Sequence, residues 1–391
     1  MYHKKTVFWA ACFGMLLFGI GLITLGSVAP DLRTRFGLDD VSAGTLFSIL
    51  PVGILVGSLI FGPVCDRYGY KLILIVACAG MFAGFQGIAA LSSFGLLKGC
   101  IFVFGIGAGI INGATNAVVS DISKGSEGAN LSLLGTFFGL GALGMPFIIS
   151  LLKNHFTSWQ IVAAVGWLTL AIGLFYSLIR FPPSKKVSGI TGAKTKALFK
   201  ETYLYFIGFY LFFQGSTESI FNNWTTTYFT EHLDIEQSKA LYALSLYVAG
   251  ITVMRFLTGS VFRAVKWPIL IMASLAIVLT GILLIHFGQA YAFSLIGLIL
   301  VGVGLAAGFP TMLGLAGNRY AAQSGTAFSV LFTFSLTGNM LVNYLMGLIS
   351  KNYGIQRFTS VAFVELFFLV FFCILIFRSQ AKSEKVMSHE S

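Results

Sequence analysis

The polar residues of this sequence that could do chemistry stand out because they interrupt long apolar stretches. They form three sets spaced four residues apart, so the members of each set lie on one face of a helix: Asn112 and Asn116; Gln214, Glu218 and Asn222; Asn339 and Asn343. A carboxamide both donates and accepts hydrogen bonds, as a hydroxyl-rich, uncharged ligand requires. Trp224 adds an aromatic face for a ring to stack on. These residues predict a substrate-binding site for a small polar solute, most simply a sugar, and no catalytic residue.

Glu218 is the sharpest single candidate among them. An ionisable side chain in an apolar segment is costly and usually faces a bundle interior or a water-filled cavity. Such a carboxylate could exchange a proton or bind Na⁺ through oxygen, so Glu218 is predicted to couple solute movement to H⁺ or Na⁺. The alternatives stay open: Glu218 could be a hydrogen-bonded structural residue, the amides could bond helix to helix, and transport could run without an ion.

The elements that must position these side chains follow from composition. The chain of 391 residues is 57% hydrophobic and only 10% charged, against about 25% charged residues in a soluble domain. Lipid must therefore cover much of its surface. A membrane-spanning helix needs about 20 apolar residues, and the sequence holds twelve such runs, at 7–29, 42–62, 71–92, 95–117, 130–152, 159–180, 201–223, 239–261, 268–287, 291–316, 325–349 and 357–378. The runs are continuous rather than alternating, so we expect an all-α membrane protein.

The net charge of +11 has a membrane interpretation. Most lysines and arginines fall in loops on the side of the N-terminus, which by the positive-inside rule puts both termini in the cytoplasm of a multi-pass cell-membrane protein. No basic cluster with interleaved aromatic residues indicates nucleic acid. We expect a monomer whose partners are a small-molecule solute and the lipid bilayer.

A polar stretch and an internal repeat divide the chain in two. The segment 182–200 is rich in lysine, proline and glycine and is predicted to be a cytoplasmic linker between six-helix bundles at 1–181 and 201–380, with a tail at 381–391. Sliding the chain by 197 residues pairs seven glycines, among them Gly105 with Gly302 and Gly107 with Gly304. Two parallel halves related by an axis along the membrane normal are a known transporter plan, with the solute site between them near mid-membrane.

The loop after the second run carries a family resemblance. It contains Gly62, Asp66, Arg67, Gly69 and Lys71. This spacing resembles the signature G-x-x-x-D-R-x-G-x-K of the major facilitator superfamily. The resemblance implies twelve transmembrane helices in two pseudo-symmetric bundles, alternating access, and a gating role for this loop.

Two further features extend the resemblance. The second half contains a weaker copy of the loop, from Gly250 to Arg255. Arg255 is therefore predicted to belong to a second gate; the alternative is that its side chain reaches the inner membrane surface. The segments GIGAGIINGATNAVVSD, GTFFGLGALGMP, FFQGSTESIFNNW and GVGLAAGFP resemble the fucose–galactose–glucose symporter branch of the superfamily.

Other functions are less consistent with the sequence. The five scattered cysteines suggest neither a disulfide framework nor a metal site, and no catalytic or phosphate-binding motif indicates an enzyme or a cofactor beyond a coupling ion. We therefore expect a secondary active transporter for a small polar solute, most simply a sugar. The alternatives are a drug or metabolite exporter of the same fold driven by proton antiport, which 39 phenylalanines leave open, and a non-transporting membrane sensor.

Overall fold

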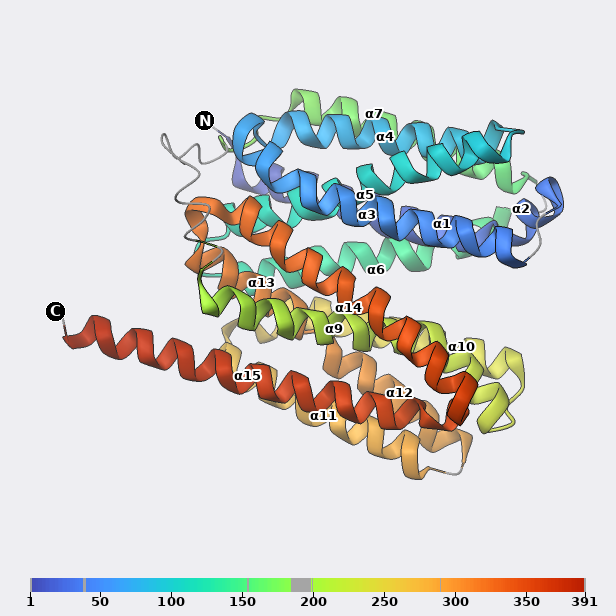
Figure 1. Ribbon diagram of the computed structural model, residues 1–391. Helices are drawn as coiled ribbons and strands as arrows, with labels where there is room; N and C mark the ends of the chain where they lie inside the picture. Colours follow the sequence, from blue (N-terminus) through green and yellow to red (C-terminus); the bar gives the residue numbers. More distant parts are fainter. Residues whose placement is uncertain are drawn as a thin grey trace. The chain divides into compact units, whose positions relative to one another are not determined.

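The computed structural model describes residues 2–37, 40–152, 155–183, 198, 200–288 and 290–389, and all regular structure within these ranges is helical (Figure 1). This is the outcome expected of an apolar chain, because a helix satisfies its own backbone hydrogen bonds where water is absent. The helices of the first half are α1 (Lys4–Ser27), α2 (Ala29–Phe36), α3 (Asp40–Tyr68), α4 (Tyr70–Ala90), α5 (Phe94–Ile122), α6 (Glu127–Leu152) and α7 (Ser158–Leu178).

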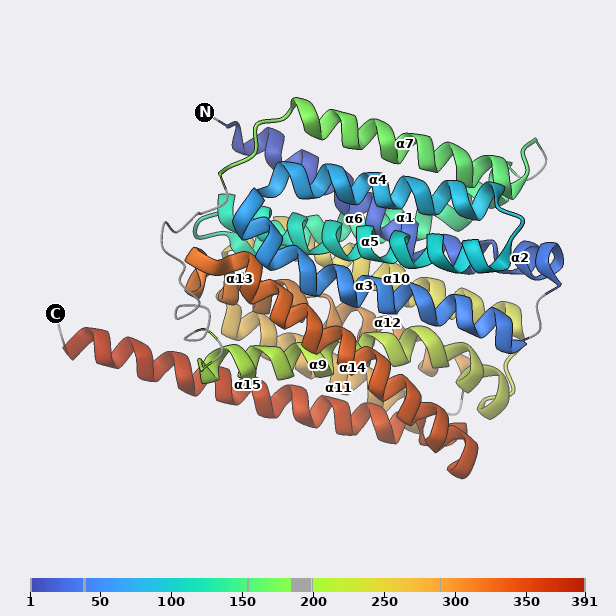
Figure 2. The same cartoon turned by 45° about the horizontal axis from the view of Figure 1, so that its top comes forward.

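The second half adds six longer helices and several short ones. They are α9 (Thr202–Thr227), the π-helix η1 (Tyr228–His232), α10 (Gln237–Ser260), η2 (Phe262–Ala264), α11 (Trp267–Phe287), α12 (Tyr291–Leu305), α13 (Gly308–Arg319), η3 (Ala321–Gln323), α14 (Ser324–Tyr353), η4 (Ile355–Arg357) and α15 (Phe358–His389). Each of the twelve predicted runs falls on a helix, which confirms the predicted all-α class. The run at 291–316 differs from the prediction because it is two helices, α12 and α13 (Figure 2).

Eleven of the helical segments in the described residues are long and apolar enough to cross a membrane. The α9 helix, 26 residues long, is not among them. Its length is sufficient, but Gln214, Glu218 and the Asn222–Asn223 pair lower its hydropathy. The helix that carries the largest predicted polar set is therefore the most polar of the twelve predicted spans.

The chain forms two compact units. Unit 1 holds Met1–Gly189 together with Gly317–Val330, and unit 2 holds Ile190–Ala316 together with Leu331–Ser391. The segment Gly317–Val330, which includes the end of α13, all of η3 and the start of α14, thus groups with the first half of the chain, a placement that the sequence did not predict. Most of the predicted linker at 182–200 and the last two residues of the tail lie outside the described residues.

Glycines let helices pack closely within each unit, and they do so at equivalent positions. In unit 1, a Cβ on Gly105 of α5 would lie 2.6 Å from the carbonyl oxygen of Leu50 on α3. In unit 2, a Cβ on Gly302 of α12 would lie 2.5 Å from the carbonyl oxygen of Tyr247 on α10. Gly302 follows Gly105 by 197 residues, and Tyr247 follows Leu50 by the same number. The repeat seen in the sequence is therefore also a repeat of helix contacts. The same offset relates two further pairs: Gly107 with Ala77, and Gly304 with Ser274.

Candidate functional site

Unit 2 contains an ion pair between α9 and α10. Nη2 of Arg255 lies 3.2 Å from Oε2 and 3.3 Å from Oε1 of Glu218. The Arg255 side chain is 10% exposed and that of Glu218 is 21% exposed. The hydroxyl of Tyr247 also donates a hydrogen bond to the backbone carbonyl of Glu218, at 3.3 Å. The pair is therefore largely shielded, with the carboxylate as its more accessible member.

This geometry changes the interpretation of Arg255. The sequence suggested either a gating residue or a side chain that reaches the inner membrane surface. Because Arg255 is buried and paired with Glu218, the second alternative is wrong. The gating role stays a prediction, and the structure adds a contact with the candidate coupling residue that spacing along the chain could not indicate.

The break between α12 and α13 contributes a backbone group to the same site. Helix α12 ends at Leu305, where the last carbonyl groups lack partners within the helix. The Gln214 amide nitrogen donates to the Leu305 carbonyl oxygen at 2.8 Å and to Oε1 of Glu218 at 3.0 Å. Both amide hydrogens of Gln214 are thus used, and this buried side chain connects the broken helix to the ion pair.

Gly308 at the start of α13 makes room for this arrangement. A Cβ at this position would collide with Oε1 of Gln214 and would lie 2.9 Å from the hydroxyl of Tyr210. Pro310, two residues later, cannot donate a backbone hydrogen bond, which is consistent with a helix interruption at this point. A glycine and a proline in an apolar run were the available sequence signal for the broken helix.

A second polar group joins α9 to α14, and we call it the α9–α14 amide cluster. It consists of Ser219, Asn223, Trp224, Asn339 and Asn343. Asn343 donates to the Ser219 hydroxyl at 2.6 Å and to the Asn339 carbonyl at 2.7 Å. Its own oxygen accepts from Asn223 at 3.0 Å and from the Trp224 indole at 3.1 Å.

These four bonds fill the hydrogen-bonding capacity of the Asn343 amide. In this arrangement Asn343 holds two helices together and has no capacity left for a ligand, as the helix-to-helix alternative stated. Asn223 and Ser219, which the sequence analysis did not select, are integral to the cluster. Their spacing of four residues, which puts them on one face of α9, could have identified them. Asn222 is exposed and makes no hydrogen bond within the described part of the chain.

The predicted pair on α5 belongs to unit 1. The Asn116 amide nitrogen donates to the backbone carbonyl of Asn112 at 2.8 Å and to its side-chain oxygen at 3.1 Å. Asn116 is 5% exposed and Asn112 is half-buried. Neither amide bonds to another helix among the described residues, so this pair retains more capacity for a solute than the α9–α14 amide cluster.

The predicted gating loop contacts the segment Gly317–Val330 within unit 1. The Thr326 hydroxyl donates to Oδ2 of Asp66 at 2.6 Å, and the Gly62 backbone N–H donates to the Ser329 hydroxyl at 3.0 Å. Gly69 has φ of +84°, a left-handed conformation that favours glycine and lets the chain turn from α3 into α4. The Arg67 guanidinium stacks 5.2 Å from the ring centre of Tyr68.

Two further carboxylates hold the same segment. Asp121, at the end of α5, accepts from the Tyr70 hydroxyl at 2.6 Å and from the Ser324 hydroxyl at 2.9 Å. Glu127 accepts from the Asn318 amide at 3.2 Å. We call Asp66, Asp121 and Glu127 the carboxylate clasp. The sequence motif identified only the first of them, because the other two lie far from it along the chain.

Another buried carboxylate contacts α9. Glu365 of α15 is 4% exposed and accepts hydrogen bonds from the hydroxyls of Ser216 and Thr217. These contacts join α15 to α9, which pack against each other within unit 2. Glu365 therefore supports the helix that carries Gln214 and Glu218 without belonging to the ion pair.

Apolar helices of membrane-spanning length, a broken helix and a twofold repeat of helix contacts define a multi-pass membrane protein of the transporter type. Residues 11–342 match the family model of the Major Facilitator Superfamily, and the chain belongs to that superfamily. The fold agrees: a solved structure of the E. coli fucose:proton symporter FucP superposes with a TM-score of 0.80 at 17% identity, covering 95% of this chain and 99% of that one.

Two sugar transporters are among the curated relatives whose names specify a solute. The glucose/mannose transporter GlcP of Bacillus subtilis is 26% identical over 365 residues, covering 86% of each chain. A putative glucose/galactose transporter of Helicobacter pylori is 24% identical over 399 residues, covering 94% of this chain and 96% of its own length. Similarity at this level extends over nearly the whole chain in both cases.

Proposed function

We propose that this protein is a secondary active transporter that moves a sugar across the cell membrane by alternating access. The observation that carries the proposal is the Glu218–Arg255 pair, with Gln214 beside Glu218 on α9. The group is polar but close to neutral overall, because the guanidinium is balanced by the carboxylate. An anionic solute would favour an uncompensated cation, whereas a neutral sugar needs donors and acceptors without excess charge. The names of the two sugar-transporting relatives support the same class.

The same pair supports proton coupling through Glu218. A proton on this carboxylate would cancel its charge and remove the attraction that holds Arg255 at 3.2 Å. Arg255 would then be free to rearrange, which links protonation to the conformation of α9 and α10. Sodium is a poorer fit at this carboxylate, since the guanidinium already occupies one side of it and repels a second cation.

The carboxylate clasp supports a gate at one end of the spans. Its bonds to Ser324, Thr326 and Asn318 hold the segment Gly317–Val330 against α3, α5 and α6 within unit 1. We propose that these bonds form and break once per transport cycle. By the charge distribution of the loops, this end faces the cytoplasm together with both termini. Reporter proteins fused to the C-terminus would test this orientation, because each reporter is active on only one side of the membrane.

Sugar counterflow in liposomes containing the purified protein tests the solute class. Vesicles loaded with unlabelled glucose, galactose or fucose should transiently accumulate the same labelled sugar from outside, and protein-free vesicles should not. Flat traces for every hexose offered would overturn the proposal. Accelerated efflux of hydrophobic cations instead would identify the exporter alternative.

Coupling requires a separate measurement with the same vesicles. An imposed inward pH gradient should drive sugar above its equilibrium level, and a proton ionophore should abolish that accumulation while leaving counterflow intact. Accumulation that follows a sodium gradient and ignores pH would refute proton coupling but not sugar transport.

A further inference from the structure

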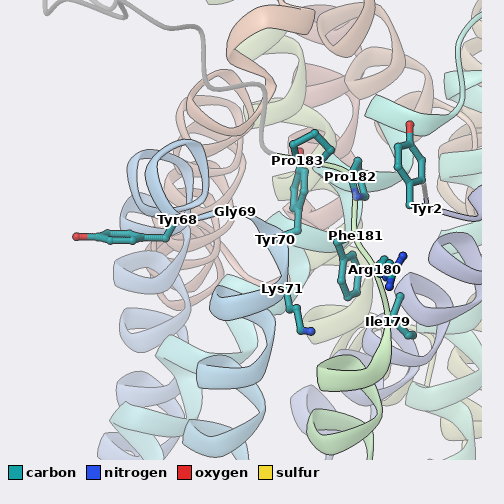
Figure 3. A pocket seen from close by; sticks show the side chains of 10 residues that line it. All are labelled: Tyr2, Tyr68, Gly69, Tyr70, Lys71, Ile179, Arg180, Phe181, Pro182 and Pro183. Atoms are coloured by element: carbon teal, nitrogen blue, oxygen red, sulfur yellow. The ribbon is translucent and has the colours of Figure 1, made fainter.

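A cavity lies at one end of unit 1, and its described lining includes no residue of the ion pair or of the carboxylate clasp. Its volume is about 600 Å³, and its lining comes from three places: Tyr2 ahead of α1, the turn from α3 into α4 at 68–71, and the chain leaving α7 at 179–183 (Figure 3). Helices α4 and α7 pack against each other within unit 1 (Figure 1). The cavity therefore lies where two neighbouring spans end.

The charge of the lining is entirely positive. Among the described residues that line the cavity, Lys71 and Arg180 are basic and none is Asp or Glu. Both cations are exposed, and among the described residues neither forms a hydrogen bond or an ion pair. The neighbouring carboxylate Asp121 is already bonded to Tyr70 and Ser324. Two uncompensated cations at one cavity favour an anionic ligand.

The position of these cations points to the lipid headgroup region. Lys71 is the second residue of the spanning helix α4, and Arg180 follows the last residue of α7 by two positions. Both therefore lie at the boundary between apolar span and polar loop, where lipid phosphates are found. Accessible tyrosines such as Tyr2 and Tyr68 in the lining are also typical of this interface. Figure 3 shows the amino group of Lys71 and the guanidinium of Arg180 extending to the side of the cavity away from Pro182 and Pro183.

We propose that this cavity binds the phosphate group of an anionic phospholipid, with Lys71 and Arg180 as its two cationic contacts. Basic pockets between spanning helices are known to select such headgroups. The volume of about 600 Å³ exceeds what a phosphate alone would fill, which leaves room for the glycerol and the beginning of the acyl chains. Because Lys71 also ends the gating loop, a bound lipid would touch the turn between α3 and α4.

Native mass spectrometry of the purified full-length protein tests the proposal. Phosphatidylglycerol and phosphatidylcholine would be added in parallel to the wild type, to the single variants Lys71→Gln and Arg180→Gln, and to the double variant. Lys98→Gln is the matched control, because this cation lies at the opposite end of the α4–α5 hairpin, where it contacts the ring of Phe94.

We expect phosphatidylglycerol to bind more tightly than phosphatidylcholine, with affinity falling about fivefold for each cation removed and about 25-fold in the double variant. The control should keep wild-type affinity. Equal retention of both lipids by the wild type, or undiminished phosphatidylglycerol binding by the double variant, would overturn the proposal. The charge-retaining pair Lys71→Arg and Arg180→Lys should keep binding, which gives a result even if the double variant fails to fold.

A soluble competitor separates a lipid from a free phosphate ester. Glycerol 3-phosphate carries the same charged group without acyl chains, so it should fail to displace phosphatidylglycerol at equal concentration. Displacement at that concentration would show that the cavity recognises a free phosphate ester and would overturn the assignment to lipid.

Discussion

The ion pair between Glu218 and Arg255 makes a prediction that tests both the structure and the coupling proposal. Unit charges 3.2 Å apart attract by about 5 kcal/mol at an effective dielectric constant of about 20. Removing one member of a buried pair costs about 3–5 kcal/mol, because the other charge loses its partner. Since the Glu218 side chain is 21% exposed and water can partly replace the lost contact, we expect about 3 kcal/mol for either single neutral variant.

A double-mutant cycle isolates this interaction. Glu218→Gln and Arg255→Gln would be combined, and the free energy of unfolding of each variant measured by reversible equilibrium denaturation. The double variant should cost little more than one single variant, which corresponds to a coupling energy of about 2–3 kcal/mol. Glu231→Gln is the control, since this carboxylate is exposed just beyond α9 and its loss should change stability by less than about 0.5 kcal/mol.

Transport by the same variants tests the functional half of the reasoning. Glu218→Gln keeps the shape of the side chain but cannot exchange a proton, so counterflow should persist while accumulation driven by a pH gradient is lost. Costs of the single variants that add within about 0.5 kcal/mol would refute the ion pair. Proton-driven accumulation by Glu218→Gln would refute coupling at this residue, whatever the stability data show.

Three other regions make shorter predictions. Asn343→Leu should destabilise the protein by about 1–3 kcal/mol in thermal melts, because it leaves the partners of four hydrogen bonds unsatisfied. Asn222→Ala, at an exposed position, should have little effect. Equal stability of the two variants would argue against a structural α9–α14 amide cluster. Gly308→Val should reduce initial uptake rates at least tenfold by displacing Gln214. Gly26→Ala should leave uptake unchanged, because no atom lies within 4 Å of the added methyl group. Normal uptake by Gly308→Val would contradict the packing of Gly308 against Gln214. Asp66→Asn and Thr326→Val should each accelerate amide hydrogen exchange across 317–330, measured by mass spectrometry, and unchanged exchange in both would show that the carboxylate clasp does not hold this segment.

Sequence reasoning was most successful where the signal is local. Twelve apolar runs predicted helices, and each run falls on a helix. Eleven helical segments of the described residues are also long and apolar enough to cross a membrane, and the exception is α9, whose polar residues lower its hydropathy. The glycine repeat in the sequence also corresponds to helix contacts in the structure, because a close approach of two helices requires the smallest residue at the contact, as at Gly105 and Gly302. The i, i+4 spacing on α9 put Gln214 and Glu218 on one helix face, and the structure shows a hydrogen bond between them.

The partners of these residues were beyond the reach of the sequence. Spacing fixes which side chains share a helix face, but the rotation and depth of each helix against its neighbours depend on the packing of the whole bundle. Only the tertiary structure could bring Arg255 to Glu218 from 37 residues away, or the Leu305 carbonyl to Gln214 from 91.

The sequence by itself therefore determined that this chain spans the membrane many times, repeats itself and carries polar groups in its spans. Tertiary packing decided how those groups are used. The Asn343 amide holds α9 to α14, while Glu218 keeps an accessible carboxylate beside a buried cation. The physical reason is that an amide or carboxylate has a fixed number of hydrogen-bonding positions, and only the three-dimensional neighbours determine which of them remain for a solute or a proton.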